Sequence, residues 1–241
     1  MKGTMTALSA RVLVVAAALA SAGCTNSATR TASQAGDVSA NGWRVLFDGS
    51  DLSAWRGFKR QDVPPAWRIE DGTLTFTPAG DGNGGDLITR DQYGDFELTL
   101  EWKISPGGNS GIMYKVTEAA DRTYETGPEM QVLDNARHPD GKNPLTSAGS
   151  DYALYAPPRD LTRPVGEWNA ARILVRGNHV EHWLNGEKSA EYELASPDWE
   201  AKVKASKFAE WPGYGRASRG HIALQDHGDR VWYRNVKIRA L

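Results

Sequence analysis

Short runs of alternating apolar and polar residues dominate the chain, and Gly, Pro, Asn and Asp separate them. A period of two places successive side chains on opposite faces of a strand, and many short runs of this kind are typical of an all-β sandwich or barrel. The predicted strands cover residues 43–47, 67–70, 73–77, 86–89, 96–104, 111–116, 129–134, 168–176, 180–184, 220–225 and 231–239. No repeat of about 20–50 residues is visible, which argues against a propeller or a solenoid.

Turn chemistry predicts three hairpins, and one segment has the pattern of a helix. The turn pairs are Asp71-Gly72, Gly177-Asn178 and Asn185-Gly186. Such pairs tolerate the left-handed backbone conformation that tight hairpin turns require. The helix is expected to run from Ser196, a good capping residue followed by Pro197, to about Phe208. Loops at 145–164 and 208–218 carry several aromatic residues, and long loops in a compact domain are usually functional.

The first residues have the pattern of a secretory signal peptide. Lys2 and Arg11 precede the apolar run 12–20, and small residues follow up to Cys24. The run is shorter than the about 20 apolar residues of a membrane-spanning helix. Cys24 is the single cysteine, and it stands where a bacterial lipobox places the cysteine that becomes lipidated. The alternative is an unmodified cysteine in an ordinary signal peptide.

We therefore expect a signal peptide at 1–23, a flexible tether at 24–40 and a single folded domain at 41–241. The tether is rich in Ser, Thr, Ala and Gly, so it cannot bury enough apolar surface to fold. The protein would be exported and anchored in a membrane through Cys24, facing the periplasm or the cell surface. Removal of the signal peptide takes away two of 28 basic residues and none of 30 acidic ones. This slightly negative and evenly spread charge argues against nucleic acid as a partner.

The strand predicted at 129–134 carries polar groups on one face. Glu129, Gln131 and Leu133 share that face, whereas Met130 and Val132 point to the other. Burial of an unpartnered carboxylate is costly, so an acid beside an amide indicates a polar cleft. The alternative is a half-exposed strand whose polar face is solvated.

A second polar strand is predicted at 220–225. His221, Ala223, Gln225 and His227 share one face if no bulge interrupts the alternation. Histidine can act as an acid, a base or a metal ligand near neutral pH. We therefore take Gln225 and His227 as the main functional candidates. His221 is a weaker one, with the alternative that it only forms a hydrogen bond at the edge of the sheet.

Five further candidates each have a structural interpretation beside the functional one. They are Glu101, Lys115, Asp134, His138 and His182. Asp134 and His138 can contact a ligand or only stabilise the turn after their strand. Lys115 can stabilise an anion or lie along the surface. His182 can face a cleft or sit within a sheet, and Glu101 can belong to a solvated face.

Several longer motifs follow one another in order between residues 42 and 241. They are Leu46-Phe-Asp-Gly49, Asn109-Ser-Gly-Ile-Met-Tyr114, Gly127-Pro-Glu-Met-Gln-Val-Leu-Asp134, Gly166-Glu-Trp-Asn169, Glu181-His-Trp-Leu-Asn-Gly186, Gly220-His-Ile-Ala-Leu-Gln-Asp-His-Gly228 and Trp232-Tyr-Arg-Asn-Val-Lys-Ile-Arg239. Together they resemble the 3-keto-disaccharide hydrolase family.

The resemblance implies a concanavalin A-like jelly roll, a sandwich of two antiparallel sheets with a sugar site on the concave sheet. It also implies cleavage of glycosides whose sugar is oxidised to a ketone at carbon 3. The ketone acidifies the proton at carbon 2, so a base can remove it and the aglycone can leave by β-elimination. Water can then add to the resulting 2-hydroxy-3-keto-glucal. No nicotinamide is needed for this step.

Such a mechanism requires a base, a group that stabilises an oxyanion, and an acid near the leaving oxygen. Glu129 is the first candidate for base or acid. The other catalytic candidates are Lys115, His182, Gln225 and His227. The substrate-binding candidates are Glu101, Gln131, Asp134, His138, Tyr155, Trp211 and Tyr214, the last three as aromatic platforms for a sugar ring.

Two other functions stay open. One is a noncatalytic, lectin-like carbohydrate-binding module. The other is an ordinary retaining glycoside hydrolase, which needs two carboxyl groups about 5–5.5 Å apart, and Glu129 with Asp134 has a spacing similar to that in some jelly-roll glucanases. No cofactor is predicted, because no tight metal-ligand motif is present. A divalent metal is left open, with ligands from Glu129, Asp134, His138, His182 and His227.

Overall fold

The structure is a computed structural model, and it describes residues 1, 3, 41–80 and 83–241. The expected cleavage site, Cys24 and the tether lie outside the described residues. Within the described parts of the chain, no helix is long and apolar enough to cross a membrane.

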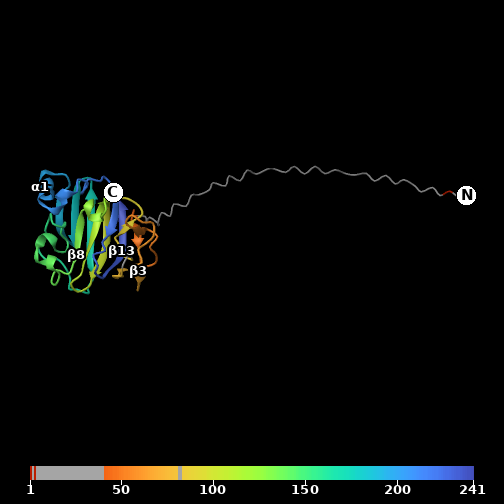
Figure 1. The fold of residues 1–241 in the computed structure, drawn as a ribbon, viewed down its shortest axis with the longest axis horizontal. Coiled ribbons are helices and arrows are strands. Elements are labelled where there is room, and N and C mark those ends of the chain that lie inside the picture. Colours follow the sequence, from red (N-terminus) through yellow and green to blue (C-terminus); the bar gives the residue numbers. More distant parts are fainter. Residues whose placement is uncertain (2, 4–40, 81–82) are drawn as a thin grey trace. The chain divides into compact units, whose positions relative to one another are not determined.

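Two antiparallel sheets form the folded domain (Figure 1). The strands of the larger sheet are β1 (Arg44–Phe47), β3 (Trp67–Glu70), β4 (Thr73–Phe76), β6 (Phe96–Ile104), β9 (Asn169–Arg176), β10 (His179–Leu184), β11 (Glu187–Glu193) and β13 (Val231–Ala240). Their order is β11-β10-β9-β6-β13-β4-β3, and β1 also pairs with β13. The strands of the smaller sheet are β2 (Trp55–Gly57), β5 (Leu87–Thr89), β7 (Asn109–Val116), β8 (Glu129–Leu133) and β12 (His221–Leu224), in the order β2-β5-β12-β7-β8. The predicted two-sheet sandwich is confirmed.

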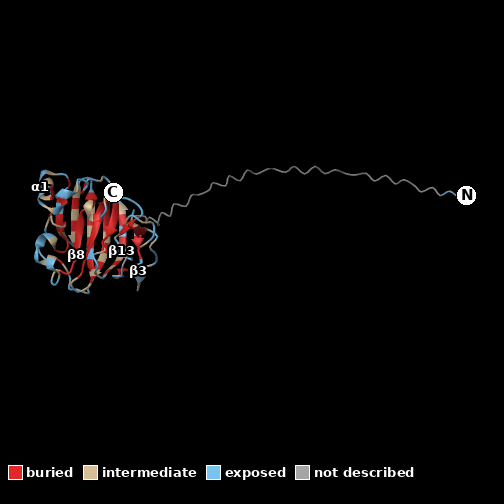
Figure 2. Ribbon diagram, in the orientation of Figure 1, coloured by how far each residue is buried: buried red, intermediate tan, exposed pale blue. Residues whose placement is uncertain are grey.

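The main core lies between the two sheets, and the alternation of side chains builds it. On β6, Leu98, Leu100 and Trp102 are buried in this core. From the smaller sheet, Met130 and Val132 of β8 enter the same core. Figure 2 shows the strands mostly in the colour of buried residues and many of the surrounding loops in that of exposed ones. Each such apolar side chain contributes about 1.5–3 kcal/mol by leaving water, which fixes the face that every strand turns inward.

The same alternation turns the other face of β7, β8 and β12 away from the main core. A second, smaller apolar cluster lies on this outer face, formed by Ile88, Met113, Val116 and Ala223. The register pairs Met113 with both Glu129 and Ala223. The polar side chains of β8 therefore stand next to an apolar floor.

The three predicted hairpins are confirmed, with Asp71, Gly177 and Asn185 in the left-handed conformation. Two strands were not predicted. β2 has only three residues, too few to show alternation. β11 is rich in charged residues because it is the edge of the larger sheet, where charges protect the unpaired backbone from other chains.

Helix α1 (Pro197–Ala205) begins at the predicted residue but ends earlier than expected. The Ser196 hydroxyl oxygen accepts a hydrogen bond from Trp199 N at 3.2 Å and caps the helix. The helix stops at Ser206, whose own hydroxyl oxygen accepts from Phe208 N at 3.1 Å and starts the 3-10 helix η4 (Lys207–Glu210). The prediction of one helix up to Phe208 is wrong, because a serine that caps a new turn competes with continuation of the helix.

Candidate active site

A polar cavity of about 250 Å³ lies on the outer face of the smaller sheet. It is lined by Asn109, Tyr124, Glu129, Gln131, Tyr152, Lys207, Gln225 and His227. Strands β7 and β8 and the residues after β12 supply its floor, because Gln131 pairs with Gly111 and Gln225 N donates to Gly111 O at 2.9 Å. Tyr124 in the 3-10 helix η1 (Thr123–Glu125), the loop at Tyr152 and η4 supply its walls.

Glu129 is the buried acid of the cavity. The residue is 5% exposed, and no described residue donates a hydrogen bond to its carboxylate. Burial raises the pKa of Glu129 to about 8; the positive charge of Lys207 opposes this rise, and the negative charges of Asp86 and Asp140 add to it. A carboxyl group in this environment is mostly protonated at neutral pH and is a much stronger base than an exposed glutamate once ionised.

Two amide oxygens in the cavity have no partner within the described chain. Asn109 is 2% exposed and Gln225 is 9% exposed, and Asn109 Oδ1 and Gln225 Oε1 accept no hydrogen bond. A buried acceptor without a donor costs about 1–3 kcal/mol. These two oxygens are therefore suited to accept hydrogen bonds from the hydroxyl groups of a ligand.

The side chain of Gln131 is already engaged with its own surroundings. Its Nε2 donates to Thr146 O at 3.3 Å, and its Oε1 accepts from Val132 N at 3.2 Å. Gln131 thus closes the floor between β8 and the following loop, and it has less capacity for a ligand than Asn109 or Gln225.

His227 lies at the rim and is exposed. Its ring packs almost perpendicular to that of His138, with 6.3 Å between the ring centroids. His138 Nδ1 accepts a hydrogen bond from Asp140 N at 3.1 Å, which leaves Nε2 as the free nitrogen of that ring. The Tyr152 hydroxyl donates to Asp140 Oδ2 at 3.4 Å, and burial raises the pKa of Tyr152 to about 12, so it stays a phenol.

A larger hollow of about 630 Å³ lies beside the end of β8, lined among others by Trp102, Asp134, Arg137 and Arg163. The carboxylate of Asp134 is buried there but both of its oxygens are engaged, since Oδ2 accepts from Gly107 N at 2.7 Å and Oδ1 from Ala136 N at 3.1 Å. Asp134 therefore stabilises the backbone around it through these hydrogen bonds. The smaller cavity has the free acid and the free acceptors that catalysis needs.

The structure brings Glu129, Gln131, Gln225 and His227 together in one cavity, with His138 beside it. Lys115 and His182 lie elsewhere. A left-handed conformation at Lys115 turns its ammonium to Ala217 O at 3.2 Å and to Ser218 O at 3.3 Å.

His182, the other catalytic candidate outside the cavity, lies in the protein interior. His182 is fully buried, and its Nε2 lies 3.0 Å from the Tyr114 hydroxyl. Burial lowers the pKa of His182 to about 3, so the ring is neutral. His221 is also separate, because the register shifts between His221 and Ala223, and its Nδ1 donates to Thr89 O at 2.7 Å.

The remaining substrate-binding candidates serve other contacts. Glu101 lies on the larger sheet and accepts from Arg234 Nε at 2.6 Å. Tyr155 stacks on Tyr192 at 4.7 Å. Tyr214 is buried and stacks on Phe208, and Trp211 packs against Tyr124 at 5.5 Å, so Trp211 touches the cavity wall from behind.

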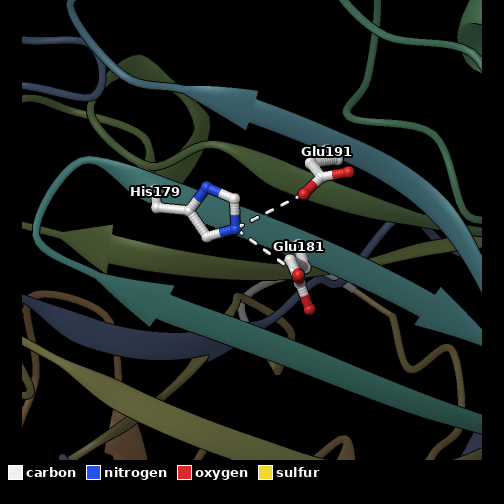
Figure 3. Close-up of side chains that lie close together, drawn as sticks. All are labelled: His179, Glu181 and Glu191. Atoms are coloured by element: carbon white, nitrogen blue, oxygen red, sulfur yellow. Dashed lines mark hydrogen bonds and ion pairs between the residues drawn. The ribbon is translucent and has the colours of Figure 1, made fainter.

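Among the described residues, one group of side chains has the geometry to hold a metal ion, and none of its members lines the polar cavity. Figure 3 shows His179, Glu181 and Glu191, whose ligand atoms lie within 4.8 Å of one another. Lys188 already bridges both acids, with Nζ 3.1 Å from Glu181 and 2.8 Å from Glu191. The group belongs to β10 and β11 of the larger sheet, and it is an ion-pair cluster.

Four lining residues were not singled out from the sequence as site candidates: Asn109, Tyr124, Tyr152 and Lys207. Asn109 could have been found, because it alternates with Gly111 and Met113 along β7. Tyr152 lies in a loop whose aromatic content indicated function. Nothing in the sequence distinguishes Lys207 from Lys202 and Lys204 of the same segment.

Known proteins resemble this chain over most of its length. A 3-keto-disaccharide hydrolase from Bacteroides thetaiotaomicron is 39% identical over 232 residues, which cover 85% of this chain and 80% of the relative. A crystal structure from Parabacteroides distasonis, assigned to the glycosyl hydrolases, superposes with a TM-score of 0.76 at 36% identity. The superposition covers 84% of this chain and 95% of the Parabacteroides chain. A second Parabacteroides distasonis structure with the same assignment has a TM-score of 0.64 at 29% identity, covering 83% and 99%.

These matches confirm the resemblance drawn from the motifs and the expectation of an enzyme. The model of one family, the 3-keto-alpha-glucoside-1,2-lyase-like domain, matches residues 42–239. The polar cavity is built from residues within that span. The chain belongs to the 3-keto-alpha-glucoside-1,2-lyase-like family.

Proposed function

We propose that this protein cleaves glycosides whose sugar carries a ketone at carbon 3, and that it does so by β-elimination. A base takes the proton from carbon 2, and the electrons of that C–H bond form an enediolate with the ketone. The enediolate then restores the ketone, forms a double bond between carbons 1 and 2, and expels the aglycone oxygen, which takes up a proton. Addition of water to this double bond gives the free 3-keto sugar, so the sum of both steps is hydrolysis.

One observation carries the proposal: the cavity has a buried acid, Glu129, whose pKa is raised to about 8. Removal of a proton from carbon needs a strong base, and the strength of a carboxylate base increases with its pKa. An exposed glutamate is about a thousandfold weaker as a base than one with this pKa. We assign Glu129 as the base that takes the carbon 2 proton.

The other lining groups fit the remaining parts of a sugar. Asn109 Oδ1 and Gln225 Oε1 are free acceptors and would bind sugar hydroxyl groups. His227 stands at the exposed rim, where an aglycone can leave toward solvent, and we assign it as the acid that protonates the leaving oxygen. The name of the Bacteroides thetaiotaomicron relative supports a 3-keto-disaccharide as the substrate class.

The two alternative functions have less support. A retaining glycosidase needs a second carboxyl group beside the first, but Glu129 is the single carboxylate among the described residues that line the cavity. Asp134, which suggested this alternative, lines the other hollow, and each of its carboxylate oxygens accepts a backbone N–H. A lectin-like module has no use for a buried, unpartnered acid, which weakens the folded state.

Three assays distinguish these functions: one with a 3-keto-glucoside, one with the matching unoxidised glucoside, and one with the 3-keto-glucoside in deuterated water. We expect aglycone release from the keto compound alone and deuterium uptake at carbon 2. Release from the unoxidised glucoside at a similar rate would contradict elimination. Binding of both sugars without release would favour the lectin-like module.

We further propose that the mature protein is a lipoprotein anchored through Cys24 and exported to the periplasm or the cell surface. The sequence pattern before Cys24 supports this proposal. Cells that express the full chain should incorporate labelled palmitate into the protein, and Cys24→Ser should abolish the label. Equal labelling of the two forms would contradict the proposal.

A further inference from the structure

Lys207 is the cation that lines the cavity, and although the residue is exposed, three aromatic rings lie around its ammonium. Its Nζ lies 4.4 Å from the ring centroid of Tyr152, 5.4 Å from that of Tyr124 and 5.3 Å from that of Phe208. The faces of aromatic rings attract a cation without neutralising it. The ammonium is therefore held in place while its charge stays available.

The backbone of Lys207 is fixed from the opposite side. Ser206 caps η4, and Phe208 stacks on Tyr214 with 3.9 Å between centroids and 11° between planes. Tyr214 stacks in turn on Trp199 of α1 at 5.8 Å. The early end of α1 at Ser206 and this buried stack together direct the residue between Ser206 and Phe208 toward the cavity.

Lys207 has no carboxylate within 4.0 Å among the described residues. The neighbouring Lys202, in contrast, pairs with Asp198 at 3.4 Å, and Lys188 pairs with two acids. The Lys207 ammonium also donates no hydrogen bond to another described residue, and the acid that shares its cavity is Glu129. A cation that faces a cavity without a counter-ion is suited to an anion that forms inside the cavity.

The negative charge that moves from base to substrate during elimination stays near the unpaired ammonium of Lys207. When the Glu129 carboxylate takes the carbon 2 proton, its negative charge passes to the enediolate oxygen at carbon 3. One nearby cation can balance the charge before and after the transfer, so the net charge of the cavity does not change. Bound sugar also displaces water, which strengthens the interaction of a cation with the developing oxyanion.

We propose that Lys207 is a catalytic residue that contacts the carbon 3 oxygen and stabilises the enediolate. This inference rests on the function proposed above, because it requires a ketone at carbon 3. A hydroxyl at carbon 3 develops no charge, so Lys207 acts on the oxidised sugar and contributes little to binding of the unoxidised one. Lys207 would therefore set the selectivity of the cavity for keto sugars.

The test compares Lys207→Met and Lys207→Arg with Lys204→Met, an exposed lysine on α1 outside the cavity. Each protein is assayed for aglycone release from a 3-keto-glucoside and for deuterium uptake at carbon 2. We expect Lys207→Met to lower kcat about 100-fold, as loss of one oxyanion-stabilising group does, and to slow deuterium uptake equally. Lys207→Arg should recover part of the rate, and Lys204→Met should match the wild type.

The pH profile separates a catalytic from a structural role. Loss of the cation should move the acid limb of kcat/KM for Lys207→Met to higher pH, because Lys207 lowers the pKa of Glu129. A kcat within about threefold of wild type, or a lower kcat with an unmoved acid limb in both Lys207 variants, would overturn the role of Lys207. Failure of the wild type to act on the keto sugar would instead overturn the proposed function.

Discussion

Gly111 lies directly against the carboxylate of Glu129. A methyl group built on Gly111 would overlap Glu129 Oε1. The two residues are diagonal neighbours across β7 and β8, because Gly111 pairs with Gln131, two residues along the strand from Glu129. The absence of a side chain at Gly111 is what allows a buried acid to lie flat on the floor of the cavity.

Gly111→Ala should therefore impair catalysis more than folding. The added methyl group displaces the Glu129 carboxylate, and a displacement of about 1 Å can cost about 100-fold in rate. We expect kcat/KM for the keto substrate to fall at least tenfold while the variant stays folded by circular dichroism. Gly94→Ala is the control, because its new methyl group would lie 3.5 Å from the nearest atom, an ordinary contact. Equal activities of the two variants would show that Glu129 has room to move.

The activity should rise with pH on the acid side. A base with a pKa of about 8 is protonated below that value, so kcat/KM should increase about tenfold per pH unit and level off near pH 8. Measurement of kcat/KM between pH 5.5 and about 9 would show this limb. A rate that instead decreases above about pH 8 would assign Glu129 as the acid.

Glu129→Gln should abolish turnover and make the fold less sensitive to high pH. The pKa of Glu129 is higher in the folded than in the unfolded state, so the folded protein holds this proton more tightly. The resulting stabilisation of the fold is fully present below the unfolded pKa of about 4.5 and is lost as pH rises through about 8. Glutamine does not titrate. We expect the free energy of unfolding of the variant, relative to wild type, to increase by about 2–4 kcal/mol from pH 5 to 8. Urea unfolding at the two values measures the change, and an equal difference at both would contradict burial of the acid.

Asn109→Ala should weaken substrate binding while leaving the free energy of unfolding nearly unchanged. Its Oδ1 is buried without a hydrogen-bond donor, so removal of the amide should not lower the free energy of unfolding by more than about 1 kcal/mol. The KM for the keto substrate should rise about tenfold, because one hydrogen bond to a hydroxyl group is lost. Gln61→Ala, at an exposed surface position, is the control. An unchanged KM would remove Asn109 from substrate recognition.

Local patterns in the sequence determined most strands, all three hairpins and the polar face of β8. Alternation along a strand is a property of neighbouring residues, and Asn-Gly or Asp-Gly turns act over two residues, so neither depends on distant contacts. For the same reason Glu129 and Gln225 could be placed on the polar faces of their strands before any partner strand was known. The family motifs added the expected fold and the class of enzyme.

The tertiary structure alone decided which of these faces meet and what covers them. β7 joins β8 to β12 only through sheet pairing, so the proximity of Glu129 and Gln225 is a long-range result. The left-handed residue Lys115 and the register shift after His221 redirect both side chains, because hydrogen bonding between strands overrides simple alternation. Lys207 reaches the cavity because Phe208 stacks into the core and Ser206 ends the helix. Packing between distant elements, which no local pattern records, thus gives Glu129 its cavity and Lys207 its place beside it.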